Sequence, residues 1–248
     1  MAQSFESWWE KLGPITKIIL VLSVCITIVG SSGVVSPYKL IVDFNLTVFS
    51  FQIWRIVTAA FYLGNFSFPW LMALAMLVTY VKLHEESEFQ GRRADFVWML
   101  TLLITFLTVV AWIFSLPLVS FALTMSLCWI FCKRNPTAKL SIYFFEFSAN
   151  IFPWALLAFH VVLGQSVMDD VAGIVAGHGF LFLHDMLPKT HGMKLVETPQ
   201  FIKTWIPHQR LFGSVHSGVH AVAPAGRQPL NEQPAHRNWG QGRVLGTR

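Results

Sequence analysis

The sequence predicts an all-α membrane protein with six transmembrane helices and a disordered C-terminal tail. Its 248 residues are 54% hydrophobic and only 12% charged, whereas soluble domains carry roughly 25% charged residues. The charges gather in short clusters, and the segments between them are apolar. Six apolar segments occur, at 15–30, 68–83, 96–115, 117–132, 149–163 and 171–187. Several are shorter than an ordinary span of roughly 20 residues, which predicts little tilt or a locally thinned bilayer.

The positions of the basic residues predict the orientation. Of the 18 lysines and arginines, all but Lys39 and Arg55 fall on one side of the predicted bundle. By the positive-inside rule, that side is the cytosol, so both termini are predicted to be cytosolic. The net charge of +5 therefore indicates topology, and no nucleic-acid partner is expected. The first segment lacks a basic leader and a small-residue cleavage site, so we expect it to remain as a span.

Two segments outside the spans are predicted to lie near the membrane. Residues 1–13 contain two adjacent tryptophans and are predicted to lie at the cytosolic interface. The outer loop, 31–66, is rich in aromatic residues, so it is expected either to lie in the interface or to pack back on the bundle. Glycosylation sequons begin at Asn45 and Asn65, but use of either is not favoured among these aromatics.

The change in composition after the sixth segment predicts two domains. Residues 1–190 are predicted to form the six-span membrane domain, and residues 191–248 to form a cytosolic tail. The start of the tail, 197–207, keeps several apolar residues and is expected to touch the membrane surface or the bundle. Beyond Gly213 the sequence is too polar to offset the entropy of ordering, which predicts disorder.

Two short patterns stand out in the membrane domain. The Arg55 guanidinium can hold either a lipid phosphate or helix carbonyls, and Trp54 is typical of a membrane interface. These residues alone favour a positional anchor and a functional motif about equally. In the last apolar segment, Gly173 and Gly177 form a GxxxG pair, which lets another helix approach closely. Such a pair most often indicates packing within the same bundle.

Serine hydrolysis is an enzymatic alternative that the residues allow us to weigh. A serine nucleophile needs a base within hydrogen-bond reach and oxyanion donors beside it. Ser126 has no flanking glycine to make room for a substrate carbonyl, and a lone serine in a span usually bonds its own helix. His178 lies in a different segment. Asp169 and Asp170 begin the last span, where a role as N-cap and first-turn residues that complement the helix dipole is favoured over a functional role.

No metal, disulfide or cofactor site is predicted. Cys25, Cys128 and Cys132 lie in apolar segments, and no histidine or further cysteine accompanies them. They are predicted to be buried apolar cysteines. A small-solute channel or transporter is also disfavoured, because the spans show neither an inverted repeat nor a line of charged residues.

Four motifs relate the sequence to a known family. They are FQIWRIVTAAFY at 51–62, the Gly173/Gly177 pair, TPQF at 198–201 and NWGQG at 238–242. With six predicted spans and cytosolic termini, the chain resembles the Derlins of the animal type, members of the rhomboid superfamily, over nearly its whole length. The resemblance implies a rhomboid-like bundle of six transmembrane helices.

The resemblance also implies a protein without protease activity. Rhomboid proteases carry Gly-x-Ser-Gly on the fourth span, where this chain has Thr124-Met125-Ser126-Leu127, so both glycines are missing. The catalytic histidine of these proteases lies three residues before the first glycine of GxxxG, a position held here by Asp170. A pseudoprotease with no catalytic residue is expected, and an intramembrane serine protease of the rhomboid type is the alternative.

Derlins act in endoplasmic-reticulum-associated degradation, so the resemblance places the chain in the endoplasmic reticulum membrane and links it to the unfolded protein response. Derlins help move misfolded proteins to the cytosol for ubiquitination and proteasomal destruction. The implied partners are misfolded substrates, a ubiquitin ligase complex, membrane lipid and the hexameric ATPase called valosin-containing protein, and a homo-oligomer is compatible with this role. A thinned bilayer would lower the cost of moving polar chain across it.

The end of the tail resembles an SHP box, a motif that docks on the amino-terminal domain of valosin-containing protein. Within 239–245, the residues assigned to the motif are Trp239, Gly240, Gly242, Arg243 and Leu245. The tryptophan and leucine would fill pockets, the glycines would let the backbone lie close, and a disordered tether can search for its partner. In the common form Arg and Leu are adjacent, whereas Val244 separates them here, so the register of Leu245 stays open.

Overall fold

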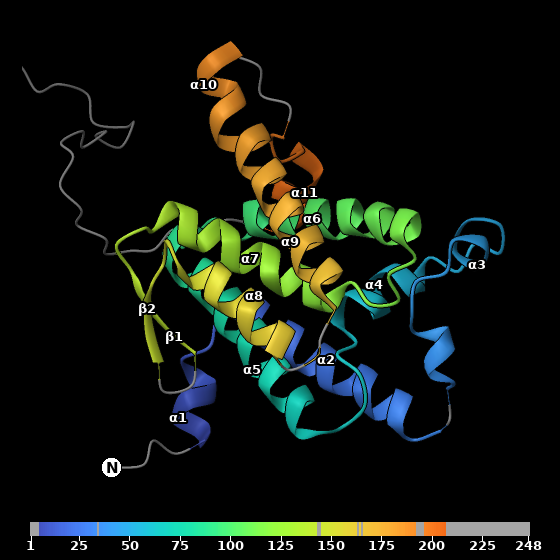
Figure 1. The fold of residues 1–248 in the computed structure, drawn as a ribbon. Helices are drawn as coiled ribbons and strands as arrows, with labels where there is room; N and C mark the ends of the chain where they lie inside the picture. The colour runs from blue at the N-terminus through green and yellow to red at the C-terminus, as the bar shows by residue number, and fades with distance from the viewer. Residues whose placement is uncertain are drawn as a thin grey trace, which may run out of the picture. The chain divides into compact units, whose positions relative to one another are not determined.

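The computed structural model describes residues 5–33, 35–142, 145–162, 164, 166–191 and 196–206, and this part of the chain is mostly helical (Figure 1). The helices are α1 (Phe5–Glu10), α2 (Pro14–Ser31), α3 (Phe44–Val48), α4 (Trp54–Phe61), α5 (Phe68–Leu83), α6 (Arg93–Phe114), α7 (Ser120–Arg134), α8 (Phe152–Val162), α9 (Val167–Leu181), α10 (Leu187–His191) and α11 (Gln200–Trp205). A 3₁₀ turn, η1 (Pro37–Lys39), follows α2, and π-helical turns, η2 (His84–Glu88) and η3 (Phe182–Met186), extend α5 and α9.

Each of the six apolar segments forms a helix, and these helices are α2, α5, α6, α7, α8 and α9. Within the described residues, three helical stretches are long and apolar enough to cross a membrane, namely Pro14–Ser31, Arg93–Phe114 and Val167–Thr190. α8 is apolar but has only 11 residues. The helical fold and the membrane character are therefore confirmed, and the count of six spans stays a prediction.

A β-hairpin departs from the all-α fold that the sequence predicts. Strands β1 (Lys139–Ile142) and β2 (Phe145–Ser148) pair antiparallel, with Lys139 opposite Ser148 and Leu140 opposite Phe147. Apolar and polar residues alternate along both strands, which is the strand period, but the alternation covers only four residues on each side. A pattern this short is easily taken for a turn, which explains why the hairpin was not predicted.

Helix α7 lies in the middle of the bundle and is covered on all sides (Figure 1). Its residues from Ala122 to Cys132 are all buried, and it packs against α4, α5, α6, α8 and α9. Because this stretch carries no charged residue, burial on every face costs little. Its hydroxyl groups bond back to their own helix, as when Thr124 Oγ1 donates to the Ser120 carbonyl at 2.8 Å.

The start of α2 is fixed by a carboxylate from η2, a turn about 70 residues further along the chain. The buried Glu85 side chain accepts from the Ile15 and Thr16 backbone N–H groups at 3.0 and 2.9 Å, and from the Thr16 hydroxyl at 2.7 Å. These bonds satisfy orphan donors at the positive end of the helix. A Cβ at Gly13 would collide with the same carboxylate, so the glycine leaves the space that Glu85 occupies.

The loop that follows α2 was expected either to lie in the membrane interface or to pack back on the bundle, and its two parts differ in this respect. Its later part packs back on the bundle, with Ala59, Ala60 and Phe61 of α4 buried in the core. Its earlier part turns aromatic side chains outward, since Phe49 and Phe51 are 73% and 78% exposed. One segment of this loop therefore contributes to the core, and the other presents an apolar surface of the kind that suits a membrane interface.

Candidate functional site

Arg55, at the start of α4, is buried and holds the loop in place. Its Nη1 donates to the carbonyl oxygens of Tyr38 and Ile41 at 2.6 and 3.0 Å, and its Nε donates to Gln52 Oε1 at 2.7 Å. Arg55 is only 3% exposed, while the neighbouring Trp54 is 57% exposed. In this arrangement the arginine bonds to loop carbonyls, as an anchor does, and the tryptophan is left to face the surroundings.

Gly173 and Gly177 lie where α9 crosses the backbone of α7. A Cβ at Gly173 would overlap the Ala122 carbonyl oxygen and come within 2.8 Å of Met125 Cβ. A Cβ at Gly177 would lie 2.9 Å from the Ser126 carbonyl oxygen. The missing side chains let the two helices approach closely, and their partner is α7 of the same bundle.

The serine and the histidine considered for catalysis are engaged elsewhere. Ser126 is fully buried, and its Oγ donates to the Leu123 carbonyl of its own helix at 2.8 Å. The ring of His178 lies against Trp129, with centroids 6.3 Å apart. A nucleophile activated by a histidine would instead direct its hydroxyl proton to the imidazole. The described geometry therefore shows Ser126 in a structural hydrogen bond.

Asp170 occupies the position that the resemblance assigns to a catalytic histidine, and it pairs with a residue that the sequence analysis missed. Both of its carboxylate oxygens lie 2.9 Å from His160 Nδ1, and the carboxylate is 1% exposed. His160 comes from α8, so the pair joins α8 to α9. The signal that pointed to it was available, because His160 is the lone ionisable side chain of an apolar segment.

The role favoured for Asp169 and Asp170 is confirmed in part: both lie in the first turn of α9, where a carboxylate complements the helix dipole, but neither is the N-cap. No side-chain bond caps the first turn of α9, where Ser166 holds the N-cap position. Asp170 turns to His160, and Asp169 Oδ1 is buried without a hydrogen-bond partner among the described residues.

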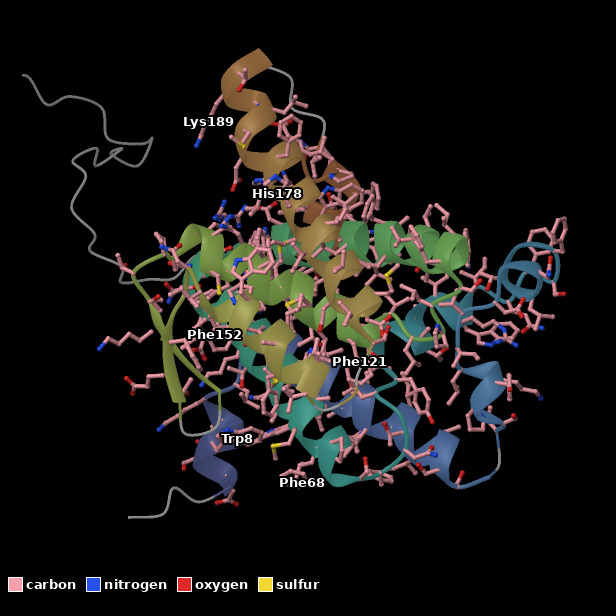
Figure 2. The ribbon with its side chains drawn as sticks, in the orientation of Figure 1. Trp8, Phe68, Phe121, Phe152, His178 and Lys189 are labelled. Atoms are coloured by element: carbon pink, nitrogen blue, oxygen red, sulfur yellow. The ribbon has the colours of Figure 1, made fainter. Side chains whose placement is uncertain are left out.

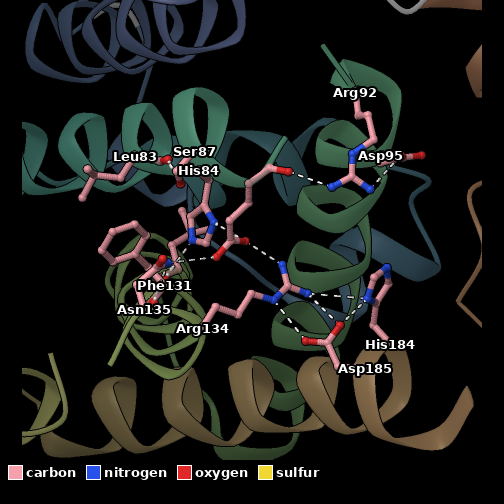
Figure 3. A network of polar contacts seen from close by, with 12 residues as sticks. Leu83, His84, Ser87, Arg92, Asp95, Phe131, Arg134, Asn135, His184 and Asp185 are labelled. Atoms are coloured by element: carbon pink, nitrogen blue, oxygen red, sulfur yellow. Dashed lines mark hydrogen bonds and ion pairs between the residues drawn. The ribbon is translucent and has the colours of Figure 1, made fainter. Parts of the chain in front are cut away.

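A network of charged side chains lies at the C-terminal end of α7, where it joins the ends of three helices (Figure 3). Arg134 Nη1 donates to Glu88 Oε2 at 2.6 Å, while its Nε and Nη2 donate to the two oxygens of Asp185 at 3.0 Å. His84 extends the network, since its ring nitrogens lie 3.2 Å from Glu88 Oε2 and 2.9 Å from the Leu127 carbonyl. The network links α7 with η2 and η3.

The pKa of Glu88 reflects this network. Burial by itself would raise the pKa of the carboxyl group. Hydrogen bonds and charges from His84 and Arg134 act in the other direction and prevail, so the pKa lies below its ordinary value. Glu88 is therefore held as a carboxylate, the form that bonds Arg134 most strongly.

The TPQF motif lies against the start of α6. Thr198 Oγ1 donates to Asp95 Oδ1 at 2.6 Å, across 103 residues of sequence. The motif leads into α11, whose Phe201 and Trp205 are 64% and 86% exposed. This part of the tail therefore touches the bundle through Thr198 and turns aromatic side chains outward.

The three cysteines differ in their surroundings. Cys128 and Cys132 are buried, with sulfur atoms 4.0 Å apart, as predicted for apolar cysteines. Cys25 was also predicted to be buried, but it is exposed on α2. Its segment is apolar all round, so the sequence does not show which face turns away from the bundle. Among the described residues, no group of His, Cys, Asp or Glu has an arrangement suited to a metal ion.

The residues assigned to the docking motif lie outside the described part of the chain, which ends at residue 206. They are Trp239, Gly240, Gly242, Arg243 and Leu245. Their role, and the domain boundary placed at residue 190, stay predictions.

Comparison with known proteins shows the family to which the chain belongs. The model of the Der1-like family matches residues 12–200. Derlin-2.1 of Zea mays is 33% identical over 247 residues, which cover 94% of this chain and 99% of that protein. Derlin-2 of Oryza sativa subsp. japonica is 35% identical over 82% of this chain and 86% of its own length, and Derlin-1 of Homo sapiens is 31% identical over 96% and 97%. The chain, with its buried Arg55 and its close α7–α9 crossing, belongs to the Der1-like family of Derlins.

Proposed function

We propose that this chain is a non-enzymatic factor of endoplasmic-reticulum-associated degradation, which assists the retrotranslocation of misfolded proteins. Family membership supports the pathway, and the geometry around Asp170 supports the lack of catalysis. The carboxylate at the position of the protease histidine is buried and paired with His160. Ser126, the serine at the position of the protease nucleophile, bonds its own helix. The observation that carries the proposal is that the Ser126 hydroxyl bonds the Leu123 carbonyl, and that no hydrogen bond recorded among the described residues joins it to a basic side chain.

The short helices support the idea that the protein works in a thinned membrane. At about 1.5 Å per residue, the 11 residues of α8 and the 16 residues of α5, two helices with exposed apolar side chains, rise about 16 and 24 Å. The hydrocarbon core of an ordinary bilayer is about 30 Å thick. A bilayer that thins to meet these helices presents a lower barrier to polar chain. The protein would thus assist transport without a pore of its own.

The proposal includes the recruitment of valosin-containing protein by the tail and the presence of a ubiquitin ligase in the same assembly. Its support is the sequence of 239–245, an aromatic anchor set in polar chain. The membrane domain would lower the barrier, and the ATPase would supply the pulling force. In this arrangement both termini are cytosolic, in the endoplasmic reticulum membrane, as the distribution of basic residues favours.

The proposal is tested by clearance of a misfolded lumenal reporter in cells that lack the endogenous protein. We expect Ser126→Ala to restore clearance as wild type does, because Ser126 performs no chemistry. We expect Trp239→Ala to restore little, although both proteins should accumulate to the same level. Purification in mild detergent should recover the ATPase and a ligase with Ser126→Ala, and should lose the ATPase with Trp239→Ala. Loss of clearance with Ser126→Ala at normal abundance, together with a cleaved substrate fragment in wild type, would instead establish a protease.

A further inference from the structure

Four side chains from three helices meet on the surface formed by α7, α8 and α9. Trp129 of α7 lies at the centre and is 6% exposed. The ring of Trp154 from α8 packs edge-on against it at 5.8 Å, and the ring of His178 from α9, labelled in Figure 2, lies at 6.3 Å. Lys133, one turn further along α7, places its Nζ 4.7 Å from the centre of the Trp129 ring. We name these four residues the Trp129 cluster.

The Trp129 cluster carries hydrogen-bond donors that lack an acceptor. Lys133 is exposed, and none of the ion pairs recorded among the described residues joins a carboxylate to its Nζ within 4.0 Å. Trp129 Nε1 is buried and has no hydrogen-bond partner among the described residues. A buried donor of this kind costs free energy unless a partner is supplied. An anion with several acceptor oxygens would give the exposed Lys133 ammonium a partner.

Two exposed apolar stripes lead away from the Trp129 cluster. On α8, Trp154 and Val161 share a face at a spacing of seven residues, and both are exposed. On α9, Val171 and Val175 precede His178 on one face, and all three are exposed. Trp154 lies near the start of α8 and His178 lies near the end of α9. The Trp129 cluster therefore lies at one end of both stripes, and the short connection between the two helices lies at the other. A surface that is polar at one end and apolar along the rest is complementary to a phospholipid.

We propose that the Trp129 cluster binds the headgroup of an anionic phospholipid in the leaflet at the Lys133 end of α7. The phosphate accepts from the Lys133 ammonium and from the ring N–H of His178, and the indoles of Trp129 and Trp154 lie at headgroup level, where tryptophan is enriched in membrane proteins. The acyl chains follow the stripes on α8 and α9. The excess of basic residues assigns this end to the cytosolic leaflet, which is the one rich in anionic lipid.

The test uses the full chain in nanodiscs of phosphatidylcholine, each with a small fraction of either photoreactive phosphatidylserine or photoreactive phosphatidylcholine. After illumination, cross-linked peptides are located by mass spectrometry. We expect phosphatidylserine to label the peptides that carry Trp129, Trp154 and His178 more than phosphatidylcholine does. Lys133→Gln should reduce that labelling about fivefold, as expected for one basic residue at an anionic surface.

The matched control is Lys139→Gln, which removes the same charge from the exposed start of β1. This variant should label as wild type does. His178→Gln tests the second donor with little change of volume, and it should reduce labelling without lowering the thermal stability. Soluble glycerophosphoserine should not compete, since it lacks the acyl chains. Equal labelling by the two lipids, or equal losses for Lys133→Gln and Lys139→Gln, would overturn the proposal.

Discussion

Arg55 shows how a single buried charge organises the loop before α4. Its side chain reaches back over 14 and 17 residues to the carbonyls of Ile41 and Tyr38, and Gln52 binds its remaining edge. Thr58 adds a bond to the Leu40 carbonyl at 3.2 Å. A planar, always charged guanidinium can satisfy several acceptors at fixed angles, which an ammonium cannot do. The conformation of the loop therefore depends on an arginine at this position.

The first prediction is that Arg55→Lys lowers the stability of the folded protein in detergent. A lysine cannot bond Tyr38, Ile41 and Gln52 together, so buried acceptors lose their partners. Each such loss costs about 1–3 kcal/mol. The measurement is thermal unfolding followed by the fluorescence of a thiol-reactive dye. Lys39→Gln, an exposed change in the same loop, should unfold at the wild-type temperature, and equal curves for both variants would refute the anchor.

The second prediction concerns Glu88 and pH. Its pKa is lowered in the folded protein, whereas the unfolded value is near 4.5. A carboxylate with a lowered pKa stabilises the fold above the unfolded pKa, and this contribution is lost as the pH falls through the folded pKa. We therefore expect Glu88→Gln to be less stable than wild type at pH 7.

The difference between Glu88→Gln and wild type should shrink steadily below pH 4.5, as the carboxylate of the wild type becomes protonated. Denaturation in detergent at a series of pH values measures it. Glu86→Gln is the control, since Glu86 is exposed and its ion pair with Lys82 spans 3.7 Å at the surface. Such surface pairs contribute little, so its difference from wild type should be small at every pH. A gap for Glu88→Gln that stays constant with pH would contradict the prediction.

At the scale of the elements, the crossing of α7 and α9 holds the bundle together. Gly173 and Gly177 face the backbone of α7, while Gly179 of the same helix faces open space. Below this crossing, the His160–Asp170 pair ties α8 to α9, and above it Arg134 ties α7 to η3. Helix α9 and its extension η3 are therefore held at three places along their length. Two of these contacts are between charged or polar side chains, and the glycine crossing between them depends on the absence of side chains.

The third prediction compares two glycines of α9. Gly173→Ala should destabilise the bundle by about 1–3 kcal/mol, because the new methyl group overlaps the α7 backbone and forces the helices apart. Gly179→Ala should leave stability unchanged or raise it by up to about 1 kcal/mol, since alanine favours the helix. Thermal unfolding of both variants in one detergent decides the matter. Equal effects of the two changes would mean that the crossing tolerates a side chain at Gly173.

At the scale of the whole molecule, the membrane domain and the end of the tail are expected to act separately. The core lies among α2 and α4 to α9, together with the segments that pack on them. The tail motif is expected to add binding without adding to this core. A docking residue should therefore be replaceable without loss of the folded membrane domain.

The fourth prediction is that a synthetic peptide of residues 236–248 binds the isolated amino-terminal domain of valosin-containing protein with micromolar affinity. If Trp239 is the main anchor, Trp239→Ala should remove about 2 kcal/mol, or roughly a thirtyfold loss of affinity. Calorimetric titration measures both peptides. Equal binding by the two, or no binding by either, would show that this motif is not the dock. Comparing Leu245→Ala with Val244→Ala identifies the residue that fills the second pocket.

Much of the fold follows from patterns that are local in the sequence. Long apolar segments located the six helices, because a helix in lipid must satisfy its own backbone bonds and is apolar over its whole length. The GxxxG pair also indicated close helix packing, because its two glycines lie on one face of a single helix and can be recognised from their spacing alone. The hairpin at 139–148 was missed, since four-residue strands give too short an alternation to be distinguished from a turn.

The pairing of polar side chains could not be predicted from local sequence patterns. Glu85 bonds the start of α2 across about 70 residues, and Thr198 bonds Asp95 across 103. Asp170 was assigned to a cap because its position in the chain suits one, yet His160 of α8 is its partner. Which polar groups meet is decided by how whole helices cross and rotate, and no spacing along one helix carries that information.

The sequence by itself determined that this protein is a helical membrane protein of the Derlin kind, with helices at the six apolar segments and with Asp170 at the position that the family resemblance assigns to a histidine. Those features are set by composition and by residue identity, which need no partner. Only the tertiary structure decided that Arg55 bonds loop carbonyls, that Asp170 is held by His160, and that Trp129, Lys133 and His178 form one surface. These depend on the packing of separate helices, because a buried polar group takes the partner that packing brings within reach.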